Sequence, residues 1–114
     1  MEVEREVVFP AAPDEVWEAL TEAERLEEWF ANDVELDARP GGEGVFRWDD
    51  GEERHAVVRE LEEERRIVFD WDDDGQTVIE LAEVEEGTLV HVVETAPGFG
   101  TALELSAFAW TPVA

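Results

Sequence analysis

The spacing of apolar residues changes abruptly after Phe30, and this change limits most strongly what the chain can fold into. Between Pro13 and Phe30, apolar residues recur three or four positions apart, which is the spacing of one helix face. From residue 33 to residue 95, apolar and polar residues mostly alternate, as in a strand with one buried face. Turns rich in glycine divide this second part, and strands joined by short turns pair antiparallel. The sequence therefore predicts two early helices followed by an antiparallel sheet.

Turn and cap signals place the boundaries of these elements. Pro13 opens the first helix, and the capping-box pattern at Thr21–Glu24 predicts the start of the second. The same pattern precedes an apolar stretch at residues 101–109, which predicts a short C-terminal helix. We expect an α+β fold in a single domain over residues 1–114, with this helix covering one face of a sheet of about seven strands. The expected strands are residues 3–9, 33–38, 44–49, 53–62, 66–72, 76–84 and 88–95.

The charge of the chain excludes several classes of partner. It has 32 acidic residues against eight basic ones, all arginine, for a formal net charge of −24. Such a surface repels phosphate backbones and anionic membranes, so we expect no nucleic-acid and no membrane partner. No apolar run approaches the roughly 20 residues of a membrane helix, and the acidic N-terminus is unlike a signal peptide. Cysteine is absent, and we expect a cytoplasmic protein.

Few residues are suited to catalysis or metal binding. No spacing such as HExxH occurs, so we expect no metal site and no cofactor. The only serine, Ser106, lacks the glycine-flanked turn of a nucleophile elbow, and tyrosine and lysine are absent. A buried polar group needs a partner, and an arginine with a glutamate is the natural pair. The polar candidates for a buried site are Arg5, His55, Arg59, His91 and Glu94.

Strand alternation leaves one choice open among these candidates. His91 and Glu94 lie on the same expected strand, three positions apart, so they cannot face the same side of the sheet. If Val90 and Val92 point inward, Glu94 points inward and His91 points outward. If Leu89 and Val93 point inward, the reverse holds, and the sequence does not decide between the two.

Four motifs together resemble the START-like SRPBCC superfamily, in the branch of activator-of-heat-shock-ATPase homologues. They are APDEVWEALTEAERLEEWF, VELDARPGGEGVFRW, LEEERRIVFDW and VVETAPGF, and the resemblance covers residues 3 to about 100. It implies a helix-grip fold with an apolar cavity between the sheet and the C-terminal helix. Members of the superfamily bind lipids, hormones or polyketides, and some catalyse cyclisation or dehydration. Only 20 residues follow Glu94, where the family usually has a longer helix.

The resemblance makes the large apolar side chains candidates for lining such a cavity. The aromatic residues on both sides of the turn at Pro40 can equally form an ordinary core, because aromatic rings fill cores and line pockets alike. The cavity candidates are Trp17, Leu20, Trp29, Phe30, Phe46, Trp48, Val57, Phe69, Trp71, Ile79, Leu81, Phe99 and Leu103.

Three functions are compatible with these observations. The first is non-catalytic binding of a small hydrophobic or amphipathic molecule. The second is a polyketide cyclase or dehydratase with Glu94 or a histidine as general base. The third is a co-chaperone-like module that binds a protein. The apolar C-terminal stretch also suggests a homodimer, since it has two apolar stripes and its own sheet needs only one.

The net charge of −24 predicts that added salt stabilises the fold. Screening weakens the repulsion between carboxylates, and the Debye length falls to about 3 Å at 1 M salt. The melting temperature, followed by circular dichroism from low salt to about 1 M sodium chloride, should rise. A flat or falling melting temperature over this range would contradict the prediction.

Overall fold

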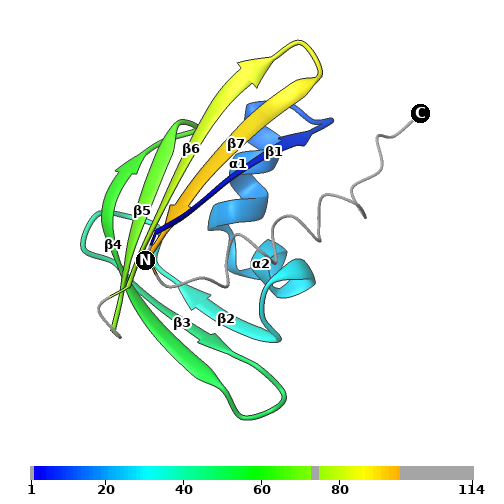
Figure 1. Cartoon of the computed structure of the whole chain (residues 1–114). Coiled ribbons are helices and arrows are strands. Elements are labelled where there is room, and N and C mark those ends of the chain that lie inside the picture. The colour runs from blue at the N-terminus through cyan, green and yellow to red at the C-terminus, as the bar shows by residue number, and fades with distance from the viewer. Residues whose placement is uncertain (1, 73–74, 96–114) are drawn as a thin grey trace.

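A curved antiparallel sheet with two helices on its concave side forms the part of the chain that the structure describes, residues 2–72 and 75–95 (Figure 1). The structure is a computed structural model. The helices are α1 (Pro13–Thr21) and α2 (Ala23–Trp29). The strands are β1 (Val3–Phe9), β2 (Asp33–Leu36), β3 (Glu43–Arg47), β4 (Glu53–Glu62), β5 (Arg66–Trp71), β6 (Gln76–Val84) and β7 (Gly87–Glu94).

The predicted α+β fold with a sheet of seven antiparallel strands is confirmed, and the strand ends differ from the prediction by one or two residues. The expected C-terminal helix and the cavity candidates Phe99 and Leu103 lie outside the described residues. The capping box at Thr21 is wrong, because Thr21 belongs to α1 and its hydroxyl donates to the Trp17 carbonyl at 2.8 Å. Glu22 precedes α2 instead, without a side-chain cap.

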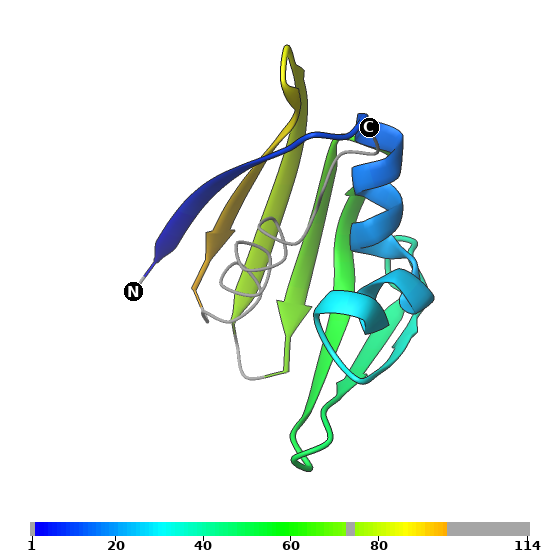
Figure 2. The ribbon, with the colours of Figure 1, turned by 90° about the vertical axis from the view of Figure 1, so that its right-hand side faces the viewer.

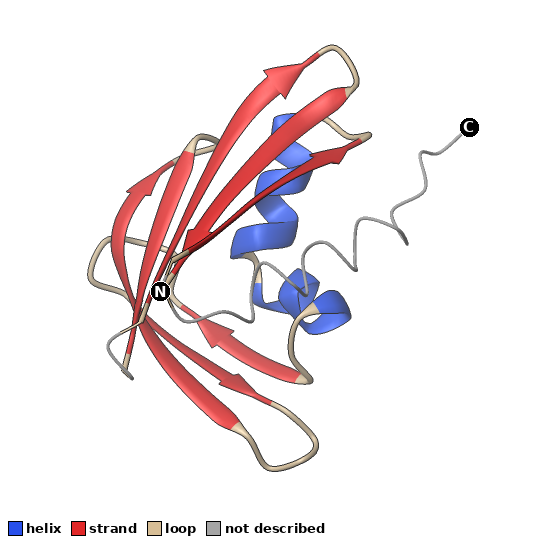
Figure 3. Cartoon of the chain, viewed as in Figure 1, coloured by secondary structure: helices blue, strands red, loops and turns tan. Residues whose placement is uncertain are grey.

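The order of strands in the sheet is β1-β7-β6-β5-β4-β3-β2. Strands β2 to β7 form a simple meander in which each strand pairs with the next, as short turns require. Strand β1 instead pairs with β7 at the far edge, so β1 and β2 are the two edges of the sheet. The helices therefore connect one edge to the other across the concave side (Figure 2, Figure 3).

A glycine turn before β3 fits closely against β4. Gly41 has a positive φ of 84°, which glycine adopts without steric cost, and its N–H donates to the Val58 carbonyl at 2.7 Å. The Gly42 carbonyl accepts the N–H of Val58 at 2.8 Å. A Cβ at Gly42 would lie 2.0 Å from the Asp37 carbonyl oxygen, so a side chain there would displace the backbone. The β4–β5 register shifts between Val58 and Glu60, directly beside this contact.

Aromatic rings join α2 to the sheet in one hydrophobic core. Phe30, at the end of α2, packs edge-on against Phe46 of β3, with ring centroids 5.4 Å apart. Phe46 in turn packs against Phe69 at 6.4 Å and Trp71 at 5.3 Å, both on β5. Tilted and edge-to-face pairs of this kind add to the stabilisation from burial alone. These rings form a core in the described structure, and Trp29 and Trp48 pack against it partly buried.

Two tryptophans also satisfy backbone carbonyls at the helix ends. The last carbonyls of a helix have no partner inside it. The indole N–H of Trp29 donates to the Ala19 carbonyl near the end of α1 at 2.9 Å. The indole N–H of Trp48 donates to the Phe30 carbonyl after α2 at 2.8 Å. Basic side chains in the last turn of a helix can donate hydrogen bonds to its last carbonyls, but neither helix has one. The two indole N–H groups supply such hydrogen bonds instead.

Replacing Trp48 by phenylalanine should therefore destabilise the protein by about 1–3 kcal/mol beyond the loss of ring area, since a partly buried carbonyl loses its donor. Trp17→Phe is the matched control, because no hydrogen bond of the Trp17 indole N–H is found within residues 2–72 and 75–95. The free energy of unfolding from urea titration measures both changes. Equal losses for the two variants would show that the Trp48 hydrogen bond contributes little.

Candidate functional site

The structure shows which of His91 and Glu94 on β7 faces the concave side of the sheet. Val90 and Val92 are completely buried on the concave side, and Glu94 is buried beside them with 1% of its surface exposed. His91 points to the outer face, where its Nε2 lies 2.6 Å from Glu4 Oε1. Glu94 is therefore the inward-facing candidate of the two, as alternation requires when Val90 and Val92 face the core.

A short chain of hydrogen bonds includes Glu94. The indole N–H of Trp71 on β5 donates to Thr77 Oγ1 on β6 at 2.9 Å, and Thr77 Oγ1 lies 3.2 Å from Glu94 Oε1 on β7. An indole N–H can only donate, so the Thr77 oxygen accepts from Trp71 and its single proton is directed to Glu94. All three side chains are buried. The chain thus fixes Glu94 Oε1 as a hydrogen-bond acceptor inside the concave face.

Two arginines lie near this polar chain. Arg5 of β1 is half-buried on the same face and pairs in register with Val92, one step along from the Val3–Glu94 pair. Diagonal positions of this kind are within reach of long side chains. The guanidinium of Arg54, at the start of β4, lies 4.1 Å from the centre of the Trp71 ring, in the range of a cation–π contact.

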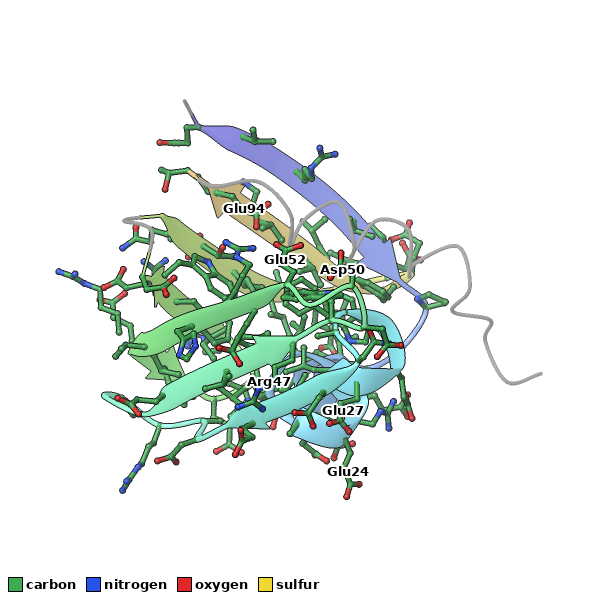
Figure 4. The ribbon with its side chains drawn as sticks, turned by 90° about the horizontal axis from the view of Figure 1, so that it is seen from below. Glu24, Glu27, Arg47, Asp50, Glu52 and Glu94 are labelled. Atoms are coloured by element: carbon green, nitrogen blue, oxygen red, sulfur yellow. The ribbon has the colours of Figure 1, made fainter. Side chains whose placement is uncertain are left out.

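Apolar side chains fill the next row of the concave face. Val92, Ile79 and Ile67 are paired neighbours on β7, β6 and β5, and all three are completely buried. Glu94 and Thr77 lie in the adjacent row, toward the end of β7 where Figure 4 labels Glu94. The face therefore combines an apolar surface with one buried polar end.

Several predicted lining residues do face this concave side and several do not. Val57 is wrong as a lining residue, because 43% of its surface is exposed on the outer face. His55 and Arg59 are also outside, where they pair with Glu53 at 3.0 Å and Asp70 at 3.1 Å. The buried lining candidates on the helices and the concave side of the sheet are Trp17, Leu20, Phe30, Phe46, Phe69, Trp71, Ile79 and Leu81.

The misplacement on β4 has a physical cause. Ala56 and Val58 point inward, so His55, Val57 and Arg59 point outward. The register shift after Val58 then returns Leu61 to the core side, although Leu61 shares the parity of Val57 in the sequence. The sequence analysis did not select Thr77 as a site residue. Thr77 lies two positions before Ile79 on the same strand, so alternation places both on the same face, and this signal could have identified it.

The outer face carries networks of ion pairs. Arg47 of β3 contacts Asp33 at 2.7 Å, Glu35 at 2.8 Å and Glu53 at 2.7 Å, and these hydrogen bonds raise the pKa of Arg47 above its usual value. Figure 4 shows Arg47 on β3, away from Glu94 on β7. The groups are exposed, so each pair contributes little to stability alone. Together they reduce repulsion on a strongly acidic surface.

An open groove of about 440 Å³ crosses the outer face of β3, β4 and β5. It contains the exposed side chain of Val57 and is separate from the buried Glu94. Its lining residues are Glu43, Gly44, Val45, His55, Ala56, Val57, Asp70, Trp71 and Asp72.

Within residues 2–72 and 75–95, no group of three or more histidine, aspartate or glutamate side chains is arranged to hold a metal ion. No helix in that part of the chain is long and apolar enough to cross a membrane.

Comparison with known proteins identifies the family. The family described as "Activator of Hsp90 ATPase homolog 1-like protein" matches residues 10–109, so the chain belongs to it. The described strands and helices agree with the helix-grip fold of this family, and the expected branch of activator-of-heat-shock-ATPase homologues is confirmed. A comparison with curated protein sequences finds no match.

Solved structures show the same fold. Protein BH1534 from Bacillus halodurans is 29% identical, with a TM-score of 0.73 over 84% of this chain and 69% of that chain. Protein MLL2253 from Mesorhizobium loti is 18% identical, with a TM-score of 0.77 over 96% of this chain and 88% of that chain. The Aha1 dimer from Colwellia psychrerythraea is 17% identical, with a TM-score of 0.77 over 96% of this chain and 90% of that chain.

The contact between His91 and Glu4 predicts a pH-dependent link between β1 and β7. The hydrogen bond to Glu4 raises the pKa of His91 above its usual value, burial opposes this, and the charges of Glu4, Glu6 and Glu80 add to the rise. A raised pKa stabilises the fold below the unfolded-state pKa of about 6.5, and this contribution is lost as the pH rises through the folded-state pKa.

A double-mutant cycle with Glu4→Gln and His91→Gln tests this link. The coupling free energy between the two residues, from urea unfolding, should be larger at pH 5.5 than at pH 9. The same cycle with Glu86→Gln in place of Glu4→Gln is the control, since Glu86 lies in the exposed turn before β7. A Glu4–His91 coupling that is equal at both pH values would contradict the prediction.

Proposed function

We propose that this protein binds a small hydrophobic or amphipathic molecule, without catalysis, against the concave face of its sheet. The observation that carries the proposal is the buried apolar row of Val92, Ile79 and Ile67, with the hydrogen-bonded pair of Thr77 and Glu94 in the adjacent row. Ligand sites are mostly apolar with a few placed polar groups, and this face has that composition. The family relationship supports the proposal, and a cytoplasmic location is part of it.

A cyclase or dehydratase activity is the second candidate, and one observation favours it. Glu94 is a buried carboxylate that an apolar substrate on this face would approach, as a general base requires. The histidine version of this candidate loses support, because His55 and His91 both point to the outer face. Binding is the main proposal, since Glu94 is the one buried carboxylate within residues 2–72 and 75–95 and no second buried acid or base accompanies it there.

Protein binding and self-association concern other surfaces. A co-chaperone-like contact would use the acidic outer face, where the groove around Val57 lies. The proposed homodimer uses the C-terminal stretch, which is outside the described residues. A family relative from Colwellia psychrerythraea is described as a dimer, and this supports testing the mass of the present chain in solution.

Binding of a neutral apolar fluorescent probe tests the main proposal. N-phenyl-1-naphthylamine should bind saturably, with one site per chain, and unlabelled decanol should displace it. Leu81→Phe adds volume to the inner face and should weaken probe binding several-fold, because a packed interior tolerates extra volume poorly. Ala82→Phe is the matched control, since Ala82 is the next residue of β6 and is exposed on the outer face.

Circular dichroism confirms that both variants remain folded before binding is compared. Equal probe affinity for the two variants would contradict binding on the concave face. Absence of saturable binding to the folded wild-type protein would overturn the proposed function itself.

A further inference from the structure

We propose that the open groove on the outer face of β3, β4 and β5 binds a basic segment of a partner protein, in which one apolar side chain lies between two basic side chains. The groove of about 440 Å³ contains the exposed side chain of Val57. It lies on the opposite face of the sheet from the proposed small-molecule site, so the two sites can be tested independently of each other.

The floor of the groove is apolar and accessible. Val57 of β4 has 43% of its surface exposed, and half-buried Val45 of β3 lines the same groove. Both point to the outer face, where most neighbouring side chains are charged. An accessible apolar surface with a polar rim is typical of a contact site for another molecule.

Carboxylates flank this floor in an order that the strand register fixes. Glu43 of β3 and Asp70 of β5 lie directly opposite Val57, one on each side. Neighbouring strands are about 4.8 Å apart, so the backbones at Glu43 and Asp70 are separated by roughly 10 Å. Asp72 borders the next row, since its N–H donates to the His55 carbonyl at 3.0 Å. The row therefore has the order acid, valine, acid.

An extended segment with alternating side chains can match this order. Side chains two positions apart point to the same side of such a segment. A basic residue, an apolar residue and a second basic residue, each two positions from the next, would then face the groove together. The flexible stems of lysine and arginine adjust the positions of the two charges.

The carboxylates of the groove are also less compensated than others on the outer face. Arg47 and Arg66 each contact two or more carboxylates of neighbouring strands. By contrast, Glu43 and Asp72 form no side-chain hydrogen bond or ion pair with any other residue in the ranges 2–72 and 75–95. Basic side chains of a partner would supply the counter-charges that this chain does not provide there.

The net charge of −24 argues against other occupants of the groove. A second copy of the chain would bring acidic surface against acidic surface, and nucleic acid or anionic lipid would be repelled in the same way. A second depression, of about 580 Å³, shares Glu43 and Val45 with the groove and continues it toward β2. The four strands β2 to β5 span roughly 14 Å, enough for about four extended residues. The proposed occupant is therefore a short basic stretch of a protein chain.

A capped peptide of sequence Gly-Lys-Ser-Leu-Ser-Lys-Gly tests the proposal by titration into the full-length, ¹⁵N-labelled protein. The salt concentration is about 0.15 M, where the Debye length is about 8 Å and distant charges are screened. Amide chemical shifts should change saturably at residues 43–45, 55–57 and 70–72. A peptide with serine in place of the leucine should bind at least about threefold more weakly, because it loses the apolar contact.

Val57→Ser should weaken binding of the leucine peptide about threefold, since it removes the apolar floor. Val8→Ser is the matched control, because Val8 is 46% exposed on the same outer face but lies on β1. Circular dichroism confirms that both variants remain folded. Equal affinities of the two variants would overturn the role of Val57 and with it the proposed groove.

The combined variant Glu43→Gln and Asp72→Asn should weaken binding about fivefold, the size expected for two exposed ion pairs. Glu85→Gln with Glu86→Gln removes the same charge at the exposed turn before β7 and should leave the affinity nearly unchanged. Equal weakening by both combined variants would show a general attraction to the acidic surface and overturn the proposal.

Three further outcomes would also overturn it. The first is the absence of saturable shifts, and the second is a set of shifts spread over the whole acidic surface. The third is a change of the groove shifts with protein concentration in the absence of peptide, which would assign the groove to a second copy of the chain. None of these outcomes bears on binding at the concave face, which the naphthylamine probe measures separately.

Discussion

Two indole hydrogen bonds tie the helices of this protein to each other and to its sheet. Trp29 binds the end of α1 from α2, and Trp48 binds the end of α2 from the residue after β3. The helices are short, with nine and seven residues, and isolated helices of that length are unstable in water. Their position therefore depends on these contacts and on the aromatic core below them. Because the helices cross the concave side from edge to edge, the same contacts define the shape of the inner face.

Alternation in the sequence predicted most of the sheet but could not orient every strand. Strand β7 has valine or leucine at both parities, so its inward face was undetermined until β6 and β1 were paired with it. On β4, Val57 and Leu61 are four positions apart, and simple alternation would put both on one face. The register shift at Val58 separates these residues, and it lies where Gly41 and Gly42 bind the strand. A contact between segments distant in sequence thus decided which side chains face inward.

The candidate site could be predicted only in part for a related reason. Glu94 was a candidate because strand alternation allowed it to face inward with Val90 and Val92, but the sequence could not connect it to Trp71 and Thr77. These three residues lie on three strands, and only the register of β5, β6 and β7 brings them into one chain. The family relationship fixes the fold, while the function of a site depends on individual polar residues such as these.

The pairing of β1 with β7 has a consequence for the order in which the protein folds. Strands β2 to β7 pair with sequence neighbours, so their hairpins can form as the chain leaves the ribosome. Strand β1 instead contacts a strand far along the chain; Glu4 and His91 are 87 positions apart. Closing so long a loop is slow compared with forming a hairpin. Strand β1 can therefore join the sheet only once β7 is available, and until then the edge of β7 remains open to other chains.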